Sequence, residues 1–255
     1  MRNILVICRK ELGSYFVSPI AYILLGLFGV IFGYMFWTSL GRFLAYSMEA
    51  QMSGSSYPMN LNEQLVRPFL YNIAVILGVF AIPLITMRLF AEEKRSGTIE
   101  LLATSPIRDM EIVIGKWIAA VMLYACLLLL TAINFIFVFR YGHPDWKPLV
   151  VAYLGLLLQA GGLLALGTFI STLTKNQIVA AAVTFGICLL LWIIGWVEYE
   201  TAAWAHVLSY FSVVNHIESF LRGVLDSKDI IFYATVIFIG LFLTARSMES
   251  LRWRS

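Results

Sequence analysis

Charged residues are scarce in this chain of 255 residues. Asp, Glu, Lys and Arg make up 13% of the sequence, hydrophobic residues make up 60%, and the mean hydropathy is +0.85. Soluble domains carry about 25% charged residues, so the composition excludes an ordinary soluble domain and predicts an integral membrane protein. The net charge of +3 does not call for a nucleic-acid partner, because the chain has no soluble basic domain.

Cysteine and histidine are also rare, with three residues of each. Cys8, Cys126 and Cys188 lack the spacing of a zinc site or a disulfide framework, and we interpret them as small buried hydrophobic residues. A second group of polar residues also fits no common metal site, and we interpret its members as residues at the membrane interface. They are His206, His216, Glu198, Glu200 and Glu218. The sequence therefore predicts no metal and no cofactor in this chain.

A nucleotide-binding motif is missing as well. The pair Gly115-Lys116 has Met110 where a P-loop requires its first glycine, and Trp117 where it requires Ser or Thr. We therefore predict that the chain is not an enzyme and that it does not hydrolyse ATP itself.

Long apolar stretches are abundant, and six of them contain no charged residue. About 20 residues are needed to cross a bilayer as a helix, and the charge-free windows are 12–41, 68–87, 117–139, 148–174, 176–197 and 230–245. Their apolar residues are continuous and do not alternate, which favours helices over strands. The sequence predicts one all-α membrane domain, residues 1–255, with transmembrane helices at 19–41, 68–90, 112–139, 148–172, 177–197 and 229–247. Pro83 predicts a kink late in the second helix.

The Lys and Arg residues outside the windows are unevenly distributed. Of the 18 in the chain, twelve lie on the side of the N-terminus and six on the other side. Cytoplasmic loops carry the excess of these residues, so we expect both termini in the cytoplasm. The first apolar run is too long for a cleavable signal peptide.

The first 17 residues are too charged to cross a membrane, but they form an amphipathic pattern. Apolar residues at helical spacing oppose Arg2, Arg9, Lys10 and Glu11. The apolar set is Ile4, Leu5, Ile7, Cys8, Leu12 and Tyr15. We expect a helix over 1–17 that lies along the inner membrane surface. It would serve either as a topology anchor or as a collar that fixes the first span relative to a cytoplasmic partner.

The densest group of charges, FAEEKRSGTIELLATSP at residues 90–106, lies between the second and third windows. Residues 92–95 continue the second helix, and we expect Gly97 to break it. Residues 98–103 predict a short separate helix, and Ser105-Pro106 marks the start of the helix that leads into the third window.

Two interpretations of this short helix remain open. Charge runs are usually solvated surfaces, and Glu100 suits the first turn of a helix. Ile99, Leu101 and Leu102, however, give the helix an apolar surface, and a helix of about two turns is not stable alone. The second interpretation is therefore that it docks against another surface.

Three stretches of the chain resemble the ABC-2 type transporter permeases, the membrane subunits of bacterial ATP-binding-cassette exporters. They are EEKRSGTIELLATSP at 92–106, EIVIGKW at 111–117 and LSYFSVVNHIESFLRGVLDSKDIIFY at 208–233. The resemblance covers nearly the whole chain, and the loop motif is its most specific part. The opening KELGSYFVSPIAYI at 10–23 most resembles the gliding-motility-associated permeases.

This resemblance implies that residues 92–105 form a cytoplasmic coupling helix that docks on a separate ATPase subunit, which binds ATP and Mg. The residues implied to contact that subunit are Glu92, Glu93, Lys94, Arg95, Gly97, Thr98, Glu100, Leu101 and Leu102. The resemblance also implies a multi-pass protein of the bacterial inner membrane. Residues 198–228 would form an extracytoplasmic re-entrant helical hairpin that closes the exit of the pathway.

The partners implied by the resemblance follow from the size of the chain. A six-span permease supplies half of a translocation path, so we expect a second permease chain, identical or paralogous, and two copies of the ATPase subunit. The lipid bilayer and a periplasmic accessory subunit are further expected partners, and nucleic acid is not.

Glycines on two spans predict close helix contacts. Gly26, Gly29 and Gly33 lie on the first span, and Gly29 and Gly33 form a small-xxx-small pair. The fourth span carries Gly155, Gly161, Gly162 and Gly167. We favour packing within the chain for both groups over contact with a second chain.

Polar residues within the spans are few and uncharged. They are Asn72, Thr86, Asn134, Gln159, Thr168 and Thr184. Ion-coupled transporters and channels usually carry intramembrane charges or histidines, so their absence here points to an external energy source. Three functions remain: an ABC exporter permease, a membrane anchor or scaffold of an ABC-type complex, and an ion-coupled or passive transporter. An apolar pathway leaves the substrate open.

Overall fold

The computed structural model describes residues 2–53, 60–99, 107–142, 144–199 and 208–252. All secondary structure in these ranges is helical. Six helical stretches are long and apolar enough to cross a membrane, and they span Ala21–Met52, Asn62–Ser96, Asp109–Tyr141, Trp146–Leu173, Gln177–Trp196 and Ser227–Ser250. The predicted all-α membrane fold with six spans is thereby confirmed.

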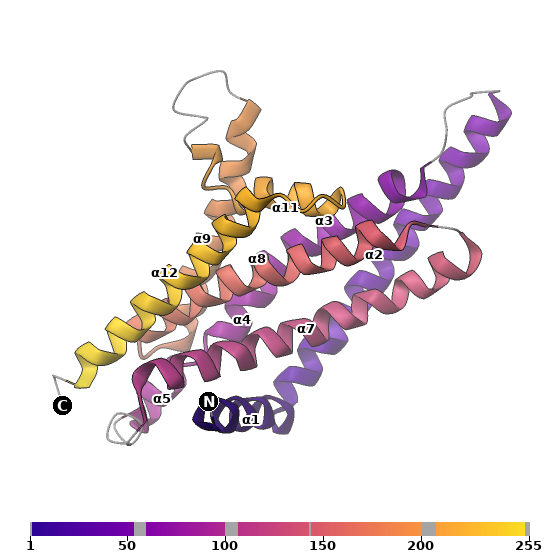
Figure 1. Ribbon diagram of the computed structural model, residues 1–255. Coiled ribbons are helices and arrows are strands. Elements are labelled where there is room, and N and C mark those ends of the chain that lie inside the picture. The colour runs from indigo at the N-terminus through magenta and orange to yellow at the C-terminus, as the bar shows by residue number, and fades with distance from the viewer. Residues whose placement is uncertain (1, 54–59, 100–106, 143, 200–207, 253–255) are drawn as a thin grey trace.

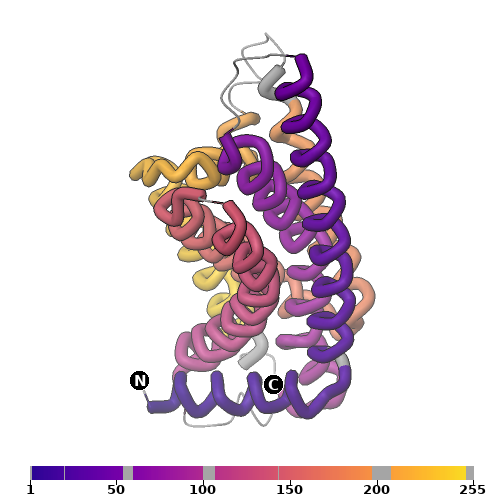
Figure 2. The backbone as a smooth tube through the Cα atoms, turned by 90° about the vertical axis from the view of Figure 1, so that its right-hand side faces the viewer, coloured from indigo at the N-terminus to yellow at the C-terminus, as the bar shows by residue number. Residues whose placement is uncertain are grey.

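Both chain termini lie at the same end of the bundle (Figure 1), which we call the terminal end. Helix α1 (Arg2–Val17) lies across this end, roughly perpendicular to the long helices (Figure 2). Helix α2 (Pro19–Met52) leaves it and runs the length of the bundle. We expected the first span to end at Gly41, but α2 continues as one helix to Met52, beyond the charge of Arg42.

The second span is a continuous rod made of short segments. Two π-helical turns alternate with α-helix, in the order η1 (Asn62–Val66), α3 (Arg67–Ile76), η2 (Leu77–Ala81), α4 (Ile82–Thr86) and α5 (Ala91–Ser96). Pro68 and Pro83 each lie in the first turn of an α-segment, where the missing N–H costs least. The π turn η2 ends at Ala81, two residues before Pro83, and the kink expected at Pro83 stays a prediction.

The fourth span is the central helix of the bundle, and the second, third, fifth and sixth spans contact it. Helix α8 (Trp146–Leu173) contacts α4, α9 (Gln177–Ile193), α7 (Asp109–Tyr141) and α12 (Ser227–Arg252). Glycines on α8 allow neighbouring elements to approach it closely. A Cβ added at Gly155 would lie 2.5 Å from Phe220, and one at Gly167 would lie 2.6 Å from Thr86. Packing within the chain is therefore confirmed for the fourth-span glycines.

Two short helices lie at the end of the bundle opposite the termini. Helix η3 (Ile194–Tyr199) continues α9, and α11 (Val213–Leu221) lies across α8 and α3. Ser212 caps α11 by accepting a hydrogen bond from Asn215 N, and Gly223, with φ of 80°, ends it. Helix α11 thus occupies the second half of the predicted outer hairpin, whereas residues 200–207 of that hairpin lie outside the described residues.

Candidate functional site

The charged segment at the terminal end begins as a helix and ends at Gly97. Helix α5 has Glu92 and Glu93 in its first turn and Lys94 and Arg95 in its last, the order that the helix dipole favours. Gly97 has φ of 73°, a left-handed conformation that glycine adopts without strain. The predicted break at Gly97 is therefore confirmed. Glu100, Leu101 and Leu102, and most of the predicted second helix, lie outside the described residues.

Helix α5 is too short to be stable alone, and the end of α8 supports it. The backbone N–H groups of Phe90 and Ala91 both donate to Ser171 Oγ, at 3.1 Å each. The ammonium of Lys94 donates to the carbonyl of Thr172. Ser171 therefore acts as an N-cap supplied by another helix, a contact that spans about 80 residues of sequence and gives no local signal.

A buried lysine connects the same segment to two further helices. Lys116 Nζ on α7 lies 2.8 Å from Glu93 Oε1 on α5 and 2.8 Å from Glu11 Oε1 on α1. The Lys116 side chain is only 2% exposed, and the ring of Phe90 lies 5.2 Å from its ammonium. We define Glu11, Glu93 and Lys116 as the lysine cluster. It joins three elements that are distant in sequence.

The described residues that we predicted to contact the ATPase subunit fall into two groups. Glu93 and Lys94 turn inward and bond to this chain, whereas Glu92, Arg95, Gly97 and Thr98 are exposed. Glu92 also lies 3.7 Å from Arg88. The exposed group offers charges of both signs to a partner.

The packing of α1 differs from the prediction. We expected its apolar residues to lie on the membrane surface, but Cys8 and Tyr15 are buried and Ile7 and Leu12 pack against the protein core. Leu5 is the exception, at 68% exposed. The reason is Gly115 on α7, which admits α1 so closely that an added Cβ would lie 2.9 Å from Ile7. Helix α1 thus packs on protein through the side that we assigned to lipid.

The first-span glycines lie on an open side of α2. A Cβ added at Gly26, Gly29 or Gly33 would meet no atom of the described chain within 4 Å. Among the described residues, the structure therefore gives no support for the packing within the chain that we favoured for them. Contact with a second chain remains a prediction for them.

At the opposite end of the bundle lie two of the residues that we interpreted as interfacial, His216 and Glu218. Both are bonded to other side chains of this chain. His216 is 5% exposed, and its Nδ1 lies 2.7 Å from Asp229 Oδ1 while its Nε2 lies 2.9 Å from the Tyr210 carbonyl. His216 is therefore buried within the protein, and its position at the membrane interface stays a prediction. His206 and Glu200 lie outside the described residues, and within those residues no group of three or more His, Cys, Asp or Glu side chains could hold a metal.

Glu218 links α11 to the second span. It accepts hydrogen bonds from Arg67 at 2.6 Å and Arg222 at 2.7 Å. Partial burial alone would raise the pKa of Glu218, but the bond from Arg222 and the charges of Arg222 and Arg67 outweigh it and lower this pKa. The carboxylate is thus held charged between two guanidinium groups.

The cysteine interpretation agrees with the structure. Cys8 and Cys188 are buried free thiols, and Cys126 is half-buried. Burial and the charge of Glu11 raise the pKa of the Cys8 thiol.

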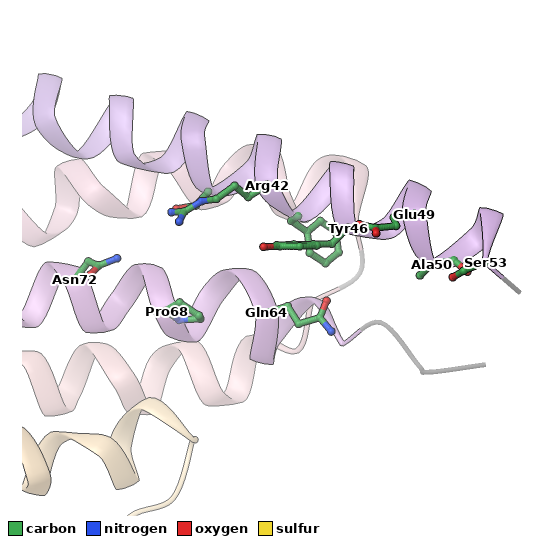
Figure 3. Close-up of a pocket in the computed structure, with 10 residues that line it drawn as sticks. Arg42, Tyr46, Glu49, Ala50, Ser53, Gln64, Pro68 and Asn72 are labelled. Carbon is green, nitrogen blue, oxygen red and sulfur yellow. The ribbon is translucent and has the colours of Figure 1, made fainter. Parts of the chain in front are cut away.

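A polar pocket of about 650 Å³ lies between α2 and the start of the second span. Figure 3 shows Arg42 and Tyr46 on the side of α2 that faces Gln64, Pro68 and Asn72. A second pocket of about 460 Å³, lined mainly by apolar residues, lies between α2 and α7. On α2, the polar pocket is lined by residues between Ser39 and Ala50, and the apolar pocket by residues between Gly33 and Leu44.

The profile of the ABC-2 family transporter proteins matches residues 5–245. The chain belongs to this ABC-2 family. Family membership makes it a multi-pass membrane protein with a permease role in an ABC transporter, and it implies an ATP-binding partner subunit and a surrounding lipid bilayer. No individual curated protein matches the sequence. For this ABC-2 protein, the resemblance to the gliding-motility subfamily stays a prediction.

Proposed function

We propose that this chain couples transport to ATP hydrolysis by a separate ATPase subunit, and that the exposed side of the α5 segment is where that subunit docks. The observation that carries the proposal is the anchoring of α5. Ser171, Thr172 and Lys116 attach this six-residue helix to α8 and α7, and through the lysine cluster to α1. A push on a helix held in this way is transmitted to the spans rather than absorbed by local bending.

The remaining contacts extend this route through the bundle. Thr172 Oγ1 donates to Ser247 Oγ on α12 at 2.8 Å, and the second half of α8 packs against α12. The second span itself continues from α5 through α4 and η2 to α3. Docking at α5 would thus reach α12 through α8 and α11 through the second span.

The positions of the buried charged residues in the spans support the same proposal. The charged residues buried in the spans, Lys116 and Asp229, lie near helix ends rather than at mid-depth. Ion relays across a membrane are built from Asp, Glu, His, Lys or Arg side chains at mid-depth. We therefore propose an export permease of the bacterial inner membrane with both termini in the cytoplasm. It would work with a second permease chain, identical or paralogous, and two ATPase copies that bind ATP and Mg.

The test is co-purification of the full chain with its ATP-binding partner subunit. Arg95→Glu reverses an exposed charge of α5, and Gly97→Pro forbids the φ of 73° at the helix end. We expect both variants to lose the ATPase. Arg42→Glu, a matched charge reversal at the other end of the bundle, should retain it.

Each alternative function has its own outcome in this test. Full ATPase binding by both α5 variants contradicts the docking site. Bound, active ATPase without any flux in proteoliposomes favours a membrane anchor or scaffold. Flux without ATP favours an ion-coupled or passive transporter.

A further inference from the structure

Gln159 lies at the middle of α8, far from either helix end, and is only 3% exposed. Its amide nitrogen Nε2 faces the carbonyl of Ala74 on α3, at 3.4 Å. Reversing the amide would set two acceptors against each other, so the carbonyl of Ala74 determines which way the side chain points. The oxygen Oε1 therefore points away from Ala74, and it has no hydrogen-bond partner among the described residues.

A hydrogen-bond donor on α9 lines the same cavity as Gln159 and also lacks a partner among the described residues. Trp192 Nε1 on α9 is buried and also has no partner in the described part of the chain. Its ring is held edge-to-face against Trp196, with centroids 4.8 Å apart. Gln159 and Trp192 line one small cavity, together with Gly78 and Cys188. An indole nitrogen can only donate and Oε1 can only accept, so one bridging group could satisfy both.

The volume of this cavity limits what that group can be. It measures about 10 Å³, and about 10 to 15 Å³ is the smallest space that holds one water. Water both accepts and donates, as the two side chains require, whereas a larger polar solute would not fit. We propose that this cavity binds a single water molecule that accepts from Trp192 Nε1 and donates to Gln159 Oε1.

Water can reach the site from the end opposite the termini. Trp192 and Val214 line the cavity and also line a pocket of about 430 Å³ that contains Arg67 and Glu218. The indole ring therefore stands between the outer polar pocket and the mid-depth cavity. This placement gives the water a route that does not cross lipid.

The bound water has a structural role at the π turn of the second span. Gly78 belongs to η2, and the amide of Gln159 bonds to Ala74 just before that turn. The carbonyl of Ala74 sets the orientation of the amide, and the water satisfies the oxygen Oε1 that this orientation leaves without a partner among the described residues. Ordered waters and local π adjustments are known means of satisfying irregular backbone inside a membrane, and π turns often lie at functional sites. The water thus stabilises the irregular joint between α3 and α4.

The experiment uses the full chain in lipid nanodiscs with its seven tryptophans labelled with ¹⁵N at the indole nitrogen. Trp192→Phe identifies the Trp192 signal by its disappearance. We expect a rotating-frame cross-peak between the Trp192 indole proton and water, with the sign of a dipolar contact rather than of proton exchange. An assigned Trp192 signal without this cross-peak overturns the proposal.

Two variants test the site by different means. Gln159→Leu removes the acceptor, and Gly78→Ala narrows the cavity with a methyl group that would lie 3.4 Å from Gln159 Nε2, an ordinary contact. We expect each to reduce the cross-peak at least several-fold. Thr184→Val, on the same helix as Trp192 but not lining the cavity, should leave it unchanged. If Gln159→Leu does not fold, Gly78→Ala decides alone, and a cross-peak of full intensity in it overturns the proposal.

Discussion

The ammonium of Lys116 lies 2.8 Å from the carboxylate of Glu93, and both side chains are almost fully shielded from water. A helix that would otherwise be an independent loop segment is thereby bound to the third span. The same ammonium holds Glu11, so a single lysine connects α1, α5 and α7.

Removing this lysine should destabilise the protein strongly. Lys116→Met leaves two carboxylates shielded without their cation, and breaking a buried ion pair from one side costs about 3–5 kcal/mol. The measurement is thermal unfolding in detergent. Lys175→Met, which removes an exposed lysine, should change stability by less than about 0.5 kcal/mol. Equal effects of the two variants would show that the cluster contributes nothing.

Ser171→Ala should loosen α5 without unfolding the bundle. The variant removes the shared acceptor of the Phe90 and Ala91 N–H groups, and loss of an N-cap costs about 1 kcal/mol. We expect faster hydrogen–deuterium exchange over residues 90–96 and unchanged exchange in α9. Ser47→Ala, whose hydroxyl bonds only within exposed α2, is the control. Unchanged exchange over 90–96 in Ser171→Ala would contradict the cap.

The two glycine groups should respond oppositely to a methyl group. Gly167→Ala places a Cβ 2.6 Å from Thr86 Oγ1, and such overpacking costs about 1–3 kcal/mol. Gly29→Ala meets nothing and should not lower the stability of the chain. If the open side of α2 contacts a second chain, Gly29→Leu should weaken the dimer in light scattering while the melting temperature of the monomer is retained. If Gly29→Ala lowers the stability of the chain as much as Gly167→Ala does, the side of α2 that carries Gly29 is not open.

Acidification should release the α11 contact with the second span. The pKa of Glu218 is lowered in the folded protein from its ordinary value of 4.5, so its stabilising effect is fully present above that value. The effect is lost as pH falls through the lowered pKa. Glu218→Gln should therefore melt at a lower temperature than the unaltered chain at pH 7, and the difference should shrink only as the pH falls below 4.5 and through the lowered pKa. Equal melting temperatures of the two chains at pH 7 would contradict the charge pairing.

Local patterns in the sequence predicted what depends on local chemistry. The charge-free windows predicted six spans because a bilayer core accepts only segments that are apolar and satisfy their own backbone. Gly97 predicted a helix end because its backbone is free to turn left-handed, and the loop motif led to the correct family. The second span extends six residues beyond its predicted limits at each end, and the far end of α2 departs most from its predicted limit. There Arg42 was expected to stop the span, but a charge beyond the bilayer does not stop a helix.

The orientation of each side chain needed the tertiary structure. Glu92 and Glu93 are adjacent and chemically alike, yet one is exposed and the other is bound to Lys116, because the position of α7 decides which side of α5 is covered. Ser171, Gln159 and His216 act through contacts with residues on other helices, which no spacing rule reveals. The glycines of α2 and α8 look equivalent in sequence and differ only in whether a neighbouring helix is present. The sequence by itself thus determined the membrane fold, its spans and its family, since these follow from composition and local motifs. Only the packing of distant helices decided which residues of the α5 segment bond to this chain and which remain exposed.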